Sequence, residues 1–145
     1  MFKHILLPTD GTEISQRAIQ TCVNFAKSIG ATIIGLHVMP EYRALAYEYQ
    51  MLENTREQFE AECILQAQGY LADITRAANS ADVPCETIFV TNDHPFAAIM
   101  EQAALHQCDL IAMASHGRRG IKGFLMGSET QKVLTHSTIP VLILR

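Results

Sequence analysis

Apolar residues follow two different spacings along this chain, and the two spacings alternate from one end to the other. Five short apolar runs end at turn-forming residues, which is typical of buried strands: Lys3–Thr9, Ala31–Met39, Cys85–Thr91, Asp109–Ser115 and Pro140–Arg145. The second run is rich in β-branched residues and stops at Pro40, as a strand does. These runs predict five strands.

The segments between the runs repeat apolar residues every three or four positions, which predicts helices. Gly30 is placed to end the first helix, and Pro95 suits the first turn of the third. The apolar residues at helical spacing are Ile19, Cys22, Val23, Ala26 and Ile29; Phe59, Cys63, Ala67, Tyr70, Leu71, Ile74 and Ala78; and Phe96, Ile99, Met100, Ala103 and Ala104. Val133, Leu134 and their neighbours are expected to form the last helix. The segment with Tyr42, Tyr47 and Tyr49 is interpreted either as a cover over a ligand or partner contact, or as a surface loop.

Strands that alternate with helices predict a parallel sheet with right-handed crossovers. We therefore expect an α/β fold with a single doubly wound, open, twisted sheet of five mainly parallel strands and helices on both faces. The strands of such a sheet are apolar on both sides. The length of 145 residues suits one domain covering positions 1–145, which is large enough to bury its own core.

Composition and charge narrow the function classes. Hydrophobic residues make up 48% and charged residues 18% of the chain, as in a globular protein, and the net charge of −4 disfavours a nucleic-acid surface. No apolar run approaches the ~18 residues of a membrane span and the first residues lack a signal-peptide pattern, so we expect a cytoplasmic protein with no membrane partner. The scattered cysteines fit neither a zinc site nor a redox motif and are expected to be buried thiols: Cys22, Cys63, Cys85 and Cys108.

Two loops follow the predicted first and fourth strands, at the edge where doubly wound sheets bind ligands. The later loop, within MASHGRRGIKGFLMGSETQKV, holds four glycines whose backbone can approach a phosphate closely. The helix that begins within GSETQ would add its free N–H groups, and Ser128 would add a hydroxyl group. The same residues also fit an ordinary connection, because Ser128 and Gln131 match a capping box that requires no ligand.

Asp10 stands directly after the first predicted strand, in the sequence PTDGTE. A carboxylate here can hold a metal, accept a phosphoryl group or bind a ribose hydroxyl group; equally, Asp10 can be a turn residue or helix N-cap with Gly11 and Thr12. A response regulator is disfavoured, since its phosphoacceptor aspartate would follow the third strand. The histidines show no metal-ligand spacing, so we expect no protein-held metal, although His37 and His116 lie near the predicted ligand edge.

Other nucleotide-binding and catalytic motifs are disfavoured. GRRGIKG lacks the G-K-[ST] ending of a Walker A loop, and no G-x-G-x-x-G follows the first strand. MASHG partly matches the G-x-S-x-G nucleophile elbow around Ser115, but Met113 replaces the first glycine. The later chain offers only Glu129 and His136 as the acid and the base of a triad. A hydrolase is therefore disfavoured.

With both loops located, the chain closely resembles the universal stress protein family over nearly its whole length, from HILLPTDGTEIS through GLHVMP to DLIAMASHGRRGIKGFLMGSETQKVLTHSTIPVLILR. The family signature is G-x-x-G, nine residues, then G-[ST]; here Gly117, nine further residues and Gly127–Ser128 match it, whereas Ala114 stands at the first glycine. Alanine there costs little where φ is negative, and on the order of 1 kcal/mol where φ must be positive. The resemblance implies a Rossmann-like fold, similar to the adenine nucleotide alpha hydrolases, with ATP at the C-terminal edge of a five-stranded sheet.

The resemblance also implies roles for individual residues. Thr9 and Asp10 would contact the ribose or adenine side, and Val38 would offer its backbone to adenine. The phosphate side would comprise Ala114, Gly117, Arg118, Gly127, Ser128, Glu129 and Thr130, with Mg²⁺ or Mn²⁺ bridging the phosphate oxygens. A homodimer through the apolar last strand is implied as well, and such pairing would bury an otherwise exposed sheet edge.

We therefore expect an ATP-binding stress-response protein that acts as a nucleotide-dependent switch or reporter. At most slow ATP hydrolysis is expected, because no catalytic base or arginine arranged for in-line attack is evident. Nucleotide occupancy would alter either the dimer or a surface for an unknown protein partner. The alternatives are a slow ATPase or nucleotidyl-transferring enzyme, a nucleotide-free dimeric interaction protein, and a flavodoxin-like module, since TDGTEIS resembles a flavin phosphate loop.

Overall fold

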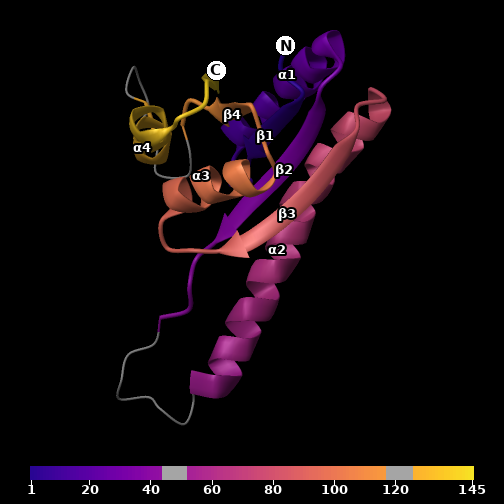
Figure 1. Cartoon of the computed structure of the whole chain (residues 1–145). Helices are drawn as coiled ribbons and strands as arrows, with labels where there is room; N and C mark the ends of the chain where they lie inside the picture. Colours follow the sequence, from indigo (N-terminus) through magenta and orange to yellow (C-terminus); the bar gives the residue numbers. More distant parts are fainter. Residues whose placement is uncertain (44–51, 117–125) are drawn as a thin grey trace.

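The computed structural model describes residues 1–43, 52–116 and 126–145, which form a sheet covered by helices (Figure 1). The strands are β1 (His4–Pro8), β2 (Thr32–Met39), β3 (Cys85–Thr91), β4 (Leu110–Ala114) and β5 (Val141–Leu144). The helices are α1 (Glu13–Ile29), α2 (Leu52–Ser80), α3 (Pro95–Leu105) and α4 (Ser128–His136). The order of elements predicted from the spacing of apolar residues is confirmed, and each strand boundary lies within one residue of its prediction.

The strands pair in the order β3-β2-β1-β4-β5, and every pair is parallel. The central strand β1 aligns Ile5 with Ile33 of β2 on one side and with Leu110 of β4 on the other. The chain builds outward from β1 to β3, and then crosses to place β4 and β5 on the opposite side of β1. The expected doubly wound sheet is therefore confirmed, and its strand order reverses between β1 and β4.

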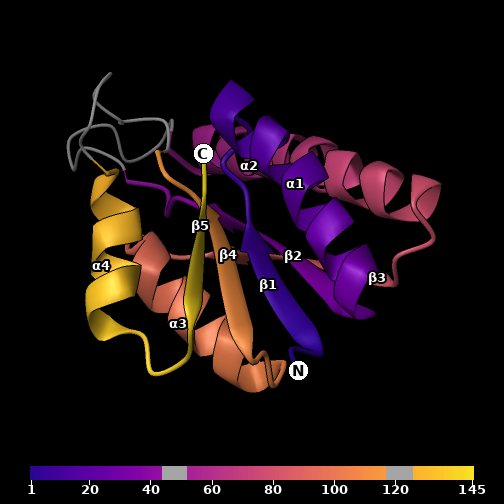
Figure 2. The same cartoon turned by 90° about the horizontal axis from the view of Figure 1, so that it is seen from above.

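Alternate residues of the strands point into two separate cores, one on each face of the sheet. Figure 2 shows α1 and α2 on one side of the sheet and α3 and α4 on the other. Helices α1 and α2 cover one face, where Ile5 packs in the same cluster as Ile74. Helices α3 and α4 cover the other face, where Leu6 and Leu36 cluster with Val133. All five side chains are fully buried, and burial of each contributes about 1.5–3 kcal/mol to folding.

Two expectations about the cores are wrong in detail. Strand β3 is not apolar on both sides, because it lies at the sheet edge and exposes Glu86 and Phe89. The predicted apolar stripe of α3 includes Ala104, yet this residue is exposed. In α3 the inward face is shifted, so that Ala98 is buried where Ala104 is not.

The ends of α1 explain how the chain passes from β1 to β2. Thr12 is the N-cap, and its side-chain oxygen accepts a hydrogen bond from the Ser15 N–H group at 3.3 Å. Gly30 ends the helix in the left-handed region, at φ +69°, and its N–H group bonds to the carbonyls of Ala26 and Lys27. The prediction that Gly30 ends this helix is confirmed, since few other residues adopt that conformation without strain.

All four cysteines are free thiols. Burial raises the pKa of the Cys22 thiol to about 12 and that of Cys108 to about 11, so both stay protonated at neutral pH. Burial is confirmed for these two, whereas Cys63 and Cys85 are only half-buried. Within the three described segments, no helix combines the length and the apolar character that a membrane crossing requires.

Candidate functional site

The carboxyl ends of β1 and β4 lie side by side where the strand order reverses. The connection after β1 leads to α1 on one face of the sheet, and the connection after β4 leads to α4 on the other. Because the two connections diverge, ligands of doubly wound folds bind between them. We call this place the switch-point edge; it comprises Thr9–Thr12 after β1, Ser115–His116 after β4, and Met126–Gly127 before α4.

The turn after β1 is organised around the Asp10 carboxylate. Its Oδ1 atom accepts hydrogen bonds from the Thr12 N–H group at 3.0 Å, the Thr12 hydroxyl at 2.7 Å and the Ser15 hydroxyl at 2.8 Å. Asp10 therefore has the turn role that the sequence allowed, while Thr12 rather than Asp10 is the N-cap. These bonds hold the half-buried carboxyl group in one defined position at the switch-point edge.

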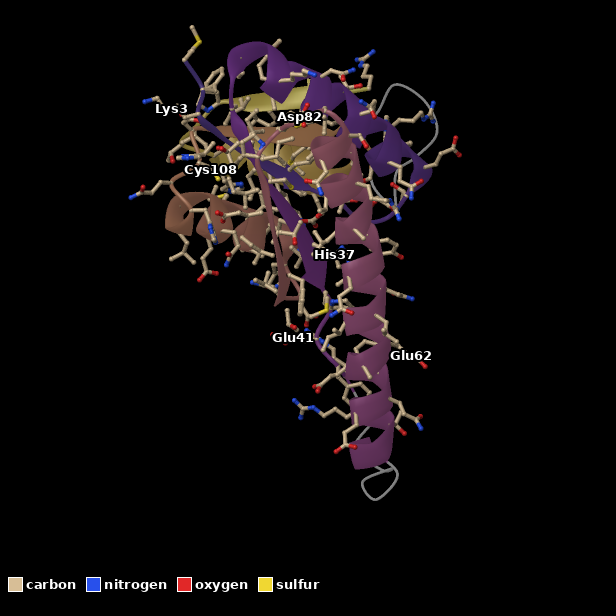
Figure 3. The ribbon with its side chains drawn as sticks, turned by 90° about the vertical axis from the view of Figure 1, so that its right-hand side faces the viewer. Lys3, His37, Glu41, Glu62, Asp82 and Cys108 are labelled. Atoms are coloured by element: carbon tan, nitrogen blue, oxygen red, sulfur yellow. The ribbon has the colours of Figure 1, made fainter. Side chains whose placement is uncertain are left out.

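Thr9 ties the end of β1 to β2 beyond the last register pair, Pro8–Leu36. Its N–H group donates to the Leu36 carbonyl at 2.8 Å, and its own carbonyl accepts from His37 Nδ1 at 2.7 Å. The His37 ring meets Tyr70 of α2 edge-on, with the ring centroids 5.1 Å apart; Figure 3 shows His37 beside this helix. Tyr70 therefore reaches the switch-point edge, although its helical spacing predicted only burial in the core.

The peptide groups of Val38 are directed toward the space beyond β1. In β2 the Thr32 N–H group bonds to β1 and the Leu36 carbonyl accepts from Thr9, whereas the Ile33 N–H group bonds toward β3. Peptide groups alternate sides along a strand, so Val38, two residues after Leu36, faces the β1 side. Because β1 ends opposite Leu36, this backbone edge lies where a ligand at the switch-point edge would meet it.

Two hydrogen bonds fasten the start of α4 to the end of β4. The Gly127 N–H group donates to the Ser115 carbonyl at 2.8 Å, and the buried Thr130 hydroxyl donates to the Ala114 carbonyl at 3.1 Å. The Ser115 N–H group in turn donates to the Leu144 carbonyl of β5 at 2.9 Å. The first turn of α4 is thereby held against the ends of β4 and β5.

Ala114, which stands at the first glycine of the predicted signature, is the buried last residue of β4. Its φ is not positive, since Asp82 and Gln107 are the non-glycine residues with positive φ in the described part of the chain. Alanine is therefore accommodated at this position without backbone strain. Gly117 and Arg118, two further predicted contacts, lie outside the described residues.

Helix α4 begins without a side-chain cap. Gly127 occupies the N-cap position and Ser128 is the exposed first residue of the helix, so the capping box of Ser128 and Gln131, the alternative that the sequence left open, does not form. The cause is the bond from Gly127 to Ser115, which holds Gly127 at the boundary and leaves Ser128 inside the first turn. The first N–H groups of a helix have no partner within it, and together with the helix dipole they favour an anion.

The Glu129 carboxylate is directed toward α3. Its Oε2 atom accepts the N–H group of Phe96 at 2.9 Å, and its Oε1 atom lies 3.3 Å from Lys132 Nζ. The N-cap residue of α3, His94, contributes no side-chain bond, so Glu129 caps this helix from its neighbour. The negative charge of Glu129 is thus compensated by a helix N-terminus and by Lys132.

Replacing Glu129 with alanine should lower the free energy of unfolding by about 1–2 kcal/mol, because α3 loses its only described cap. Urea unfolding measures this loss. Glu129→Gln is the matched control, since its amide oxygen can still accept the Phe96 N–H group. If both variants lose the same free energy of unfolding, the effect comes from the charge of Glu129 and the capping role is contradicted.

Ser115 and His116 line the side of the switch-point edge that faces α1. The Ser115 hydroxyl and His116 Nδ1 lie 2.9 Å apart, and the buried His116 Nε2 atom has no hydrogen-bond partner within the described segments. Both residues line a cavity of about 470 Å³ whose wall also includes Arg17 and Arg145. Two guanidinium groups therefore border this cavity, and that of Arg17 lies 3.9 Å from the Glu13 carboxylate.

The structure does not assemble a catalytic triad around Ser115. His136, the base that a nucleophile elbow would need, lies in the last turn of α4, where its Nδ1 atom is 2.8 Å from the Lys132 carbonyl. Ser115 contacts Gly127 at the other end of this helix, which is ~13 Å long. The Glu129 carboxylate is engaged with α3, so neither predicted partner meets Ser115.

The sequence profile of the Universal stress protein family matches residues 1–145. This chain belongs to the universal stress protein family. Among its relatives, universal stress protein YxiE of Bacillus subtilis is 30% identical over 149 residues, and the alignment covers both proteins completely. The resemblance expected from the two loops and the closing segment is therefore confirmed.

Solved structures of other universal stress proteins share the fold. Protein MJ0577 of Methanocaldococcus jannaschii superposes with a TM-score of 0.82 at 27% identity, covering 99% of this chain and 96% of that one. Two more distant members were crystallised as complexes. One is a universal stress protein with cAMP, at a TM-score of 0.68 and 23% identity, and the other is the Archaeoglobus fulgidus protein with dAMP, at 0.71 and 15%.

Proposed function

We propose that this universal stress protein binds an adenine nucleotide at the switch-point edge, with its phosphates at the first turn of α4 and its base at the end of β2. The observation that carries the proposal is the start of α4. Its first N–H groups lack a side-chain cap, and the bond between Gly127 and Ser115 holds them at the end of β4, beside β1. A helix start at a strand-order reversal is a common phosphate site in doubly wound folds.

The phosphate side of the proposed site is built mainly from backbone. Ser128 and Thr130 offer N–H groups, and the exposed Ser128 hydroxyl is a further donor. Gly127 donates its own N–H group to the Ser115 carbonyl, and its lack of a side chain leaves room for the phosphates. Glu129 contributes its N–H group while its carboxylate remains on α3. The proposal for Gly117 and Arg118 rests on the family signature alone, and Ala114 supplies the strand end from which that connection leaves.

The base and sugar side is built from the ends of β1 and β2. The Val38 peptide group faces the space beyond β1 and suits the hydrogen-bonding edge of adenine. The Asp10 carboxylate, held by Thr12 and Ser15, would accept a ribose hydroxyl group, with buried Thr9 beside it. A ligand that spans from β2 across β1 to β4 would use both sides of the site.

We propose ATP as the nucleotide, with Mg²⁺ or Mn²⁺ held by its phosphate oxygens. The adenine moiety is common to cAMP and dAMP, the ligands in the two distant complexes, which supports an adenine base. The triphosphate is proposed from the G-[ST] signature and from Arg17 and Arg145, which border the cavity beside Ser115 and Met126. Within the described residues, no group of three or more His, Cys, Asp or Glu side chains is placed to hold a metal ion, so the ion would be carried by the nucleotide.

Occupancy of the site is proposed to act as a switch in a cytoplasmic stress response, read by a homodimer or by a protein partner. Strand β5 pairs with β4 on one side and forms an edge of the sheet, and its residues Val141, Leu142 and Ile143 are only half-buried. Two-fold pairing of this edge would bury apolar surface and satisfy its peptide groups. The start of α4 bonds to Ser115 through Gly127, and Ser115 bonds to Leu144 of β5. A ligand at the start of α4 would therefore act on the β5 edge through these two bonds.

The function is tested by denaturing the purified protein, chromatographing the released small molecules, and titrating nucleotide-free protein with ATP and MgCl₂. We expect an adenine nucleotide in the released fraction and a higher melting temperature with ligand. At 100 times its Kd, ATP should raise the free energy of unfolding by about 2.7 kcal/mol. Protein that releases no adenine nucleotide, and whose unfolding is unchanged by magnesium ATP, contradicts the proposal.

A further inference from the structure

Tyr70 of α2 lies directly on the backbone of the turn after β1. A Cβ atom added to Gly11 would stand 2.2 Å from Tyr70 Cε1 and 2.3 Å from Cζ, closer than any real contact. Gly11 also has φ +78°, a conformation that side chains rarely adopt. The absence of a side chain at position 11 is therefore what allows the Tyr70 ring to rest against this turn.

His37 fixes the other side of the Tyr70 ring. The two rings meet edge-to-face at 5.1 Å with an interplanar angle of 72°, an arrangement that attracts aromatic groups. His37 cannot rotate away freely, because its Nδ1–H group donates to the Thr9 carbonyl at 2.7 Å. Since a carbonyl only accepts, this contact also assigns the proton of the neutral ring to Nδ1.

The aromatic pair stands next to the backbone edge of Val38. His37 is the residue before Val38, and Tyr70 comes from α2, which continues past the carboxyl ends of β2 and β3 (Figure 1). Both rings are half-buried, so part of their surface is accessible. A peptide edge and an aromatic surface thus border the same place, and a planar heteroaromatic base uses both, the first for hydrogen bonds and the second for ring contact.

We propose that Tyr70 is a specificity-determining residue of the nucleotide site, forming a wall against the base, and that His37 positions its ring. This inference rests on the proposed function and names the part of the ligand that α2 recognises. Neither the sugar nor the phosphates gain from an aromatic wall as a base does. The preference for a base, and for a purine over the smaller pyrimidine, therefore depends on Tyr70.

The experiment is calorimetric titration of wild type, Tyr70→Leu and Tyr70→Phe with ATP, CTP and inorganic triphosphate. Contact between a base and an aromatic side chain is stabilising, so Tyr70→Leu should bind ATP about tenfold more weakly, a loss of about 1.4 kcal/mol. Its affinity for triphosphate should stay unchanged and its preference for ATP over CTP should shrink. Tyr70→Phe keeps the ring and should bind ATP within about twofold of wild type.

Phe89→Leu is the matched control, since it removes an exposed aromatic ring of β3 and should leave all three affinities unchanged. Equal loss of ATP and triphosphate binding in Tyr70→Leu would overturn the inference, because it would mean that Tyr70 only shapes the turn. A wild-type protein that binds neither ATP nor CTP would overturn the proposed function and this inference with it. ATP binding by wild type that Tyr70→Leu fully retains would overturn the inference alone.

If the Tyr70→Leu variant does not fold, a second measurement on the wild-type protein still tests the inference. In the ATP complex, nuclear Overhauser effects should connect the ring protons of Tyr70 with the H2 or H8 proton of adenine. Their presence supports the wall. If ATP is bound but its adenine protons show no nuclear Overhauser effect to the Tyr70 ring, Tyr70 does not form a wall against the base.

Discussion

Replacing Gly11 with alanine is expected to lower the free energy of unfolding by about 2–4 kcal/mol and to weaken ATP binding more than tenfold. Two costs combine. The residue has φ +78°, where alanine is strained by about 1 kcal/mol, and the new methyl group would stand 2.2 Å from Tyr70 Cε1. Because Tyr70 must move, both the turn that holds Asp10 and the wall beside Val38 are displaced. Urea unfolding and calorimetric titration measure the two effects.

Gly30→Ala is the control for backbone strain alone. Gly30 has φ +69°, but a Cβ atom there would have no neighbour within 4 Å, so it should cost only about 1 kcal/mol and leave ATP binding intact. Combining Gly11→Ala with Tyr70→Ala removes the clash, so the double variant should lose less stability than the two single losses added together. Additive losses, or a Gly11→Ala variant no less stable than Gly30→Ala, would show that the contact with Tyr70 is unimportant.

Replacing Ser128 with aspartate should separate stability from binding. An acidic residue in the first turn of α4 interacts favourably with the helix dipole, so the protein should be as stable as wild type or gain about 0.3–1 kcal/mol. The same charge would face the phosphates at ~5 Å, where repulsion at an effective dielectric constant near 20 costs about 3 kcal/mol. ATP affinity should therefore fall about a hundredfold, as measured by calorimetry beside thermal unfolding.

Asn24→Asp, at an exposed position in the middle of α1, adds the same charge away from the switch-point edge and should leave ATP affinity unchanged. Ser128→Ala removes the hydroxyl donor without adding charge and should weaken binding less than aspartate does. If Ser128→Asp binds ATP as tightly as wild type while remaining folded, the phosphates do not lie at the start of α4.

The boundaries that depend on local chemistry could be predicted from the sequence. Gly30 ends α1 because its own backbone adopts φ +69°, and Pro40 follows β2 because proline cannot continue the ladder. The exposure of β3 could not be predicted in this way. Glu86 and Phe89 face solvent because β3 is an outermost strand of the sheet. The order of the strands cannot be deduced from the spacing of apolar residues within one segment.

The candidate site was predictable only in part, for the same reason. Thr9 and Asp10 follow a strand at the strand-order reversal, so their place could be predicted from topology. The cap of α4 depends on a hydrogen bond between Gly127 and Ser115, which lie on either side of the β4–α4 connection, and a local capping pattern therefore misplaced it. Tyr70 was missed because periodicity gives only the inward face of α2, not the length by which the helix passes the ends of the strands.

The hydrogen bonds between α4 and β4 affect how freely the sequence between His116 and Met126 can change. Because Gly127 bonds to Ser115 and Thr130 bonds to Ala114, the anchor points of the β4–α4 connection are set by the scaffold and not by the number of residues between them. In general, doubling the length of a loop adds only about 0.6 kcal/mol of closure entropy. Insertions, deletions and substitutions between His116 and Met126 should therefore change ligand affinity much more than the free energy of unfolding. Evolution or engineering can thus vary the residues between these anchor points while the fold is retained.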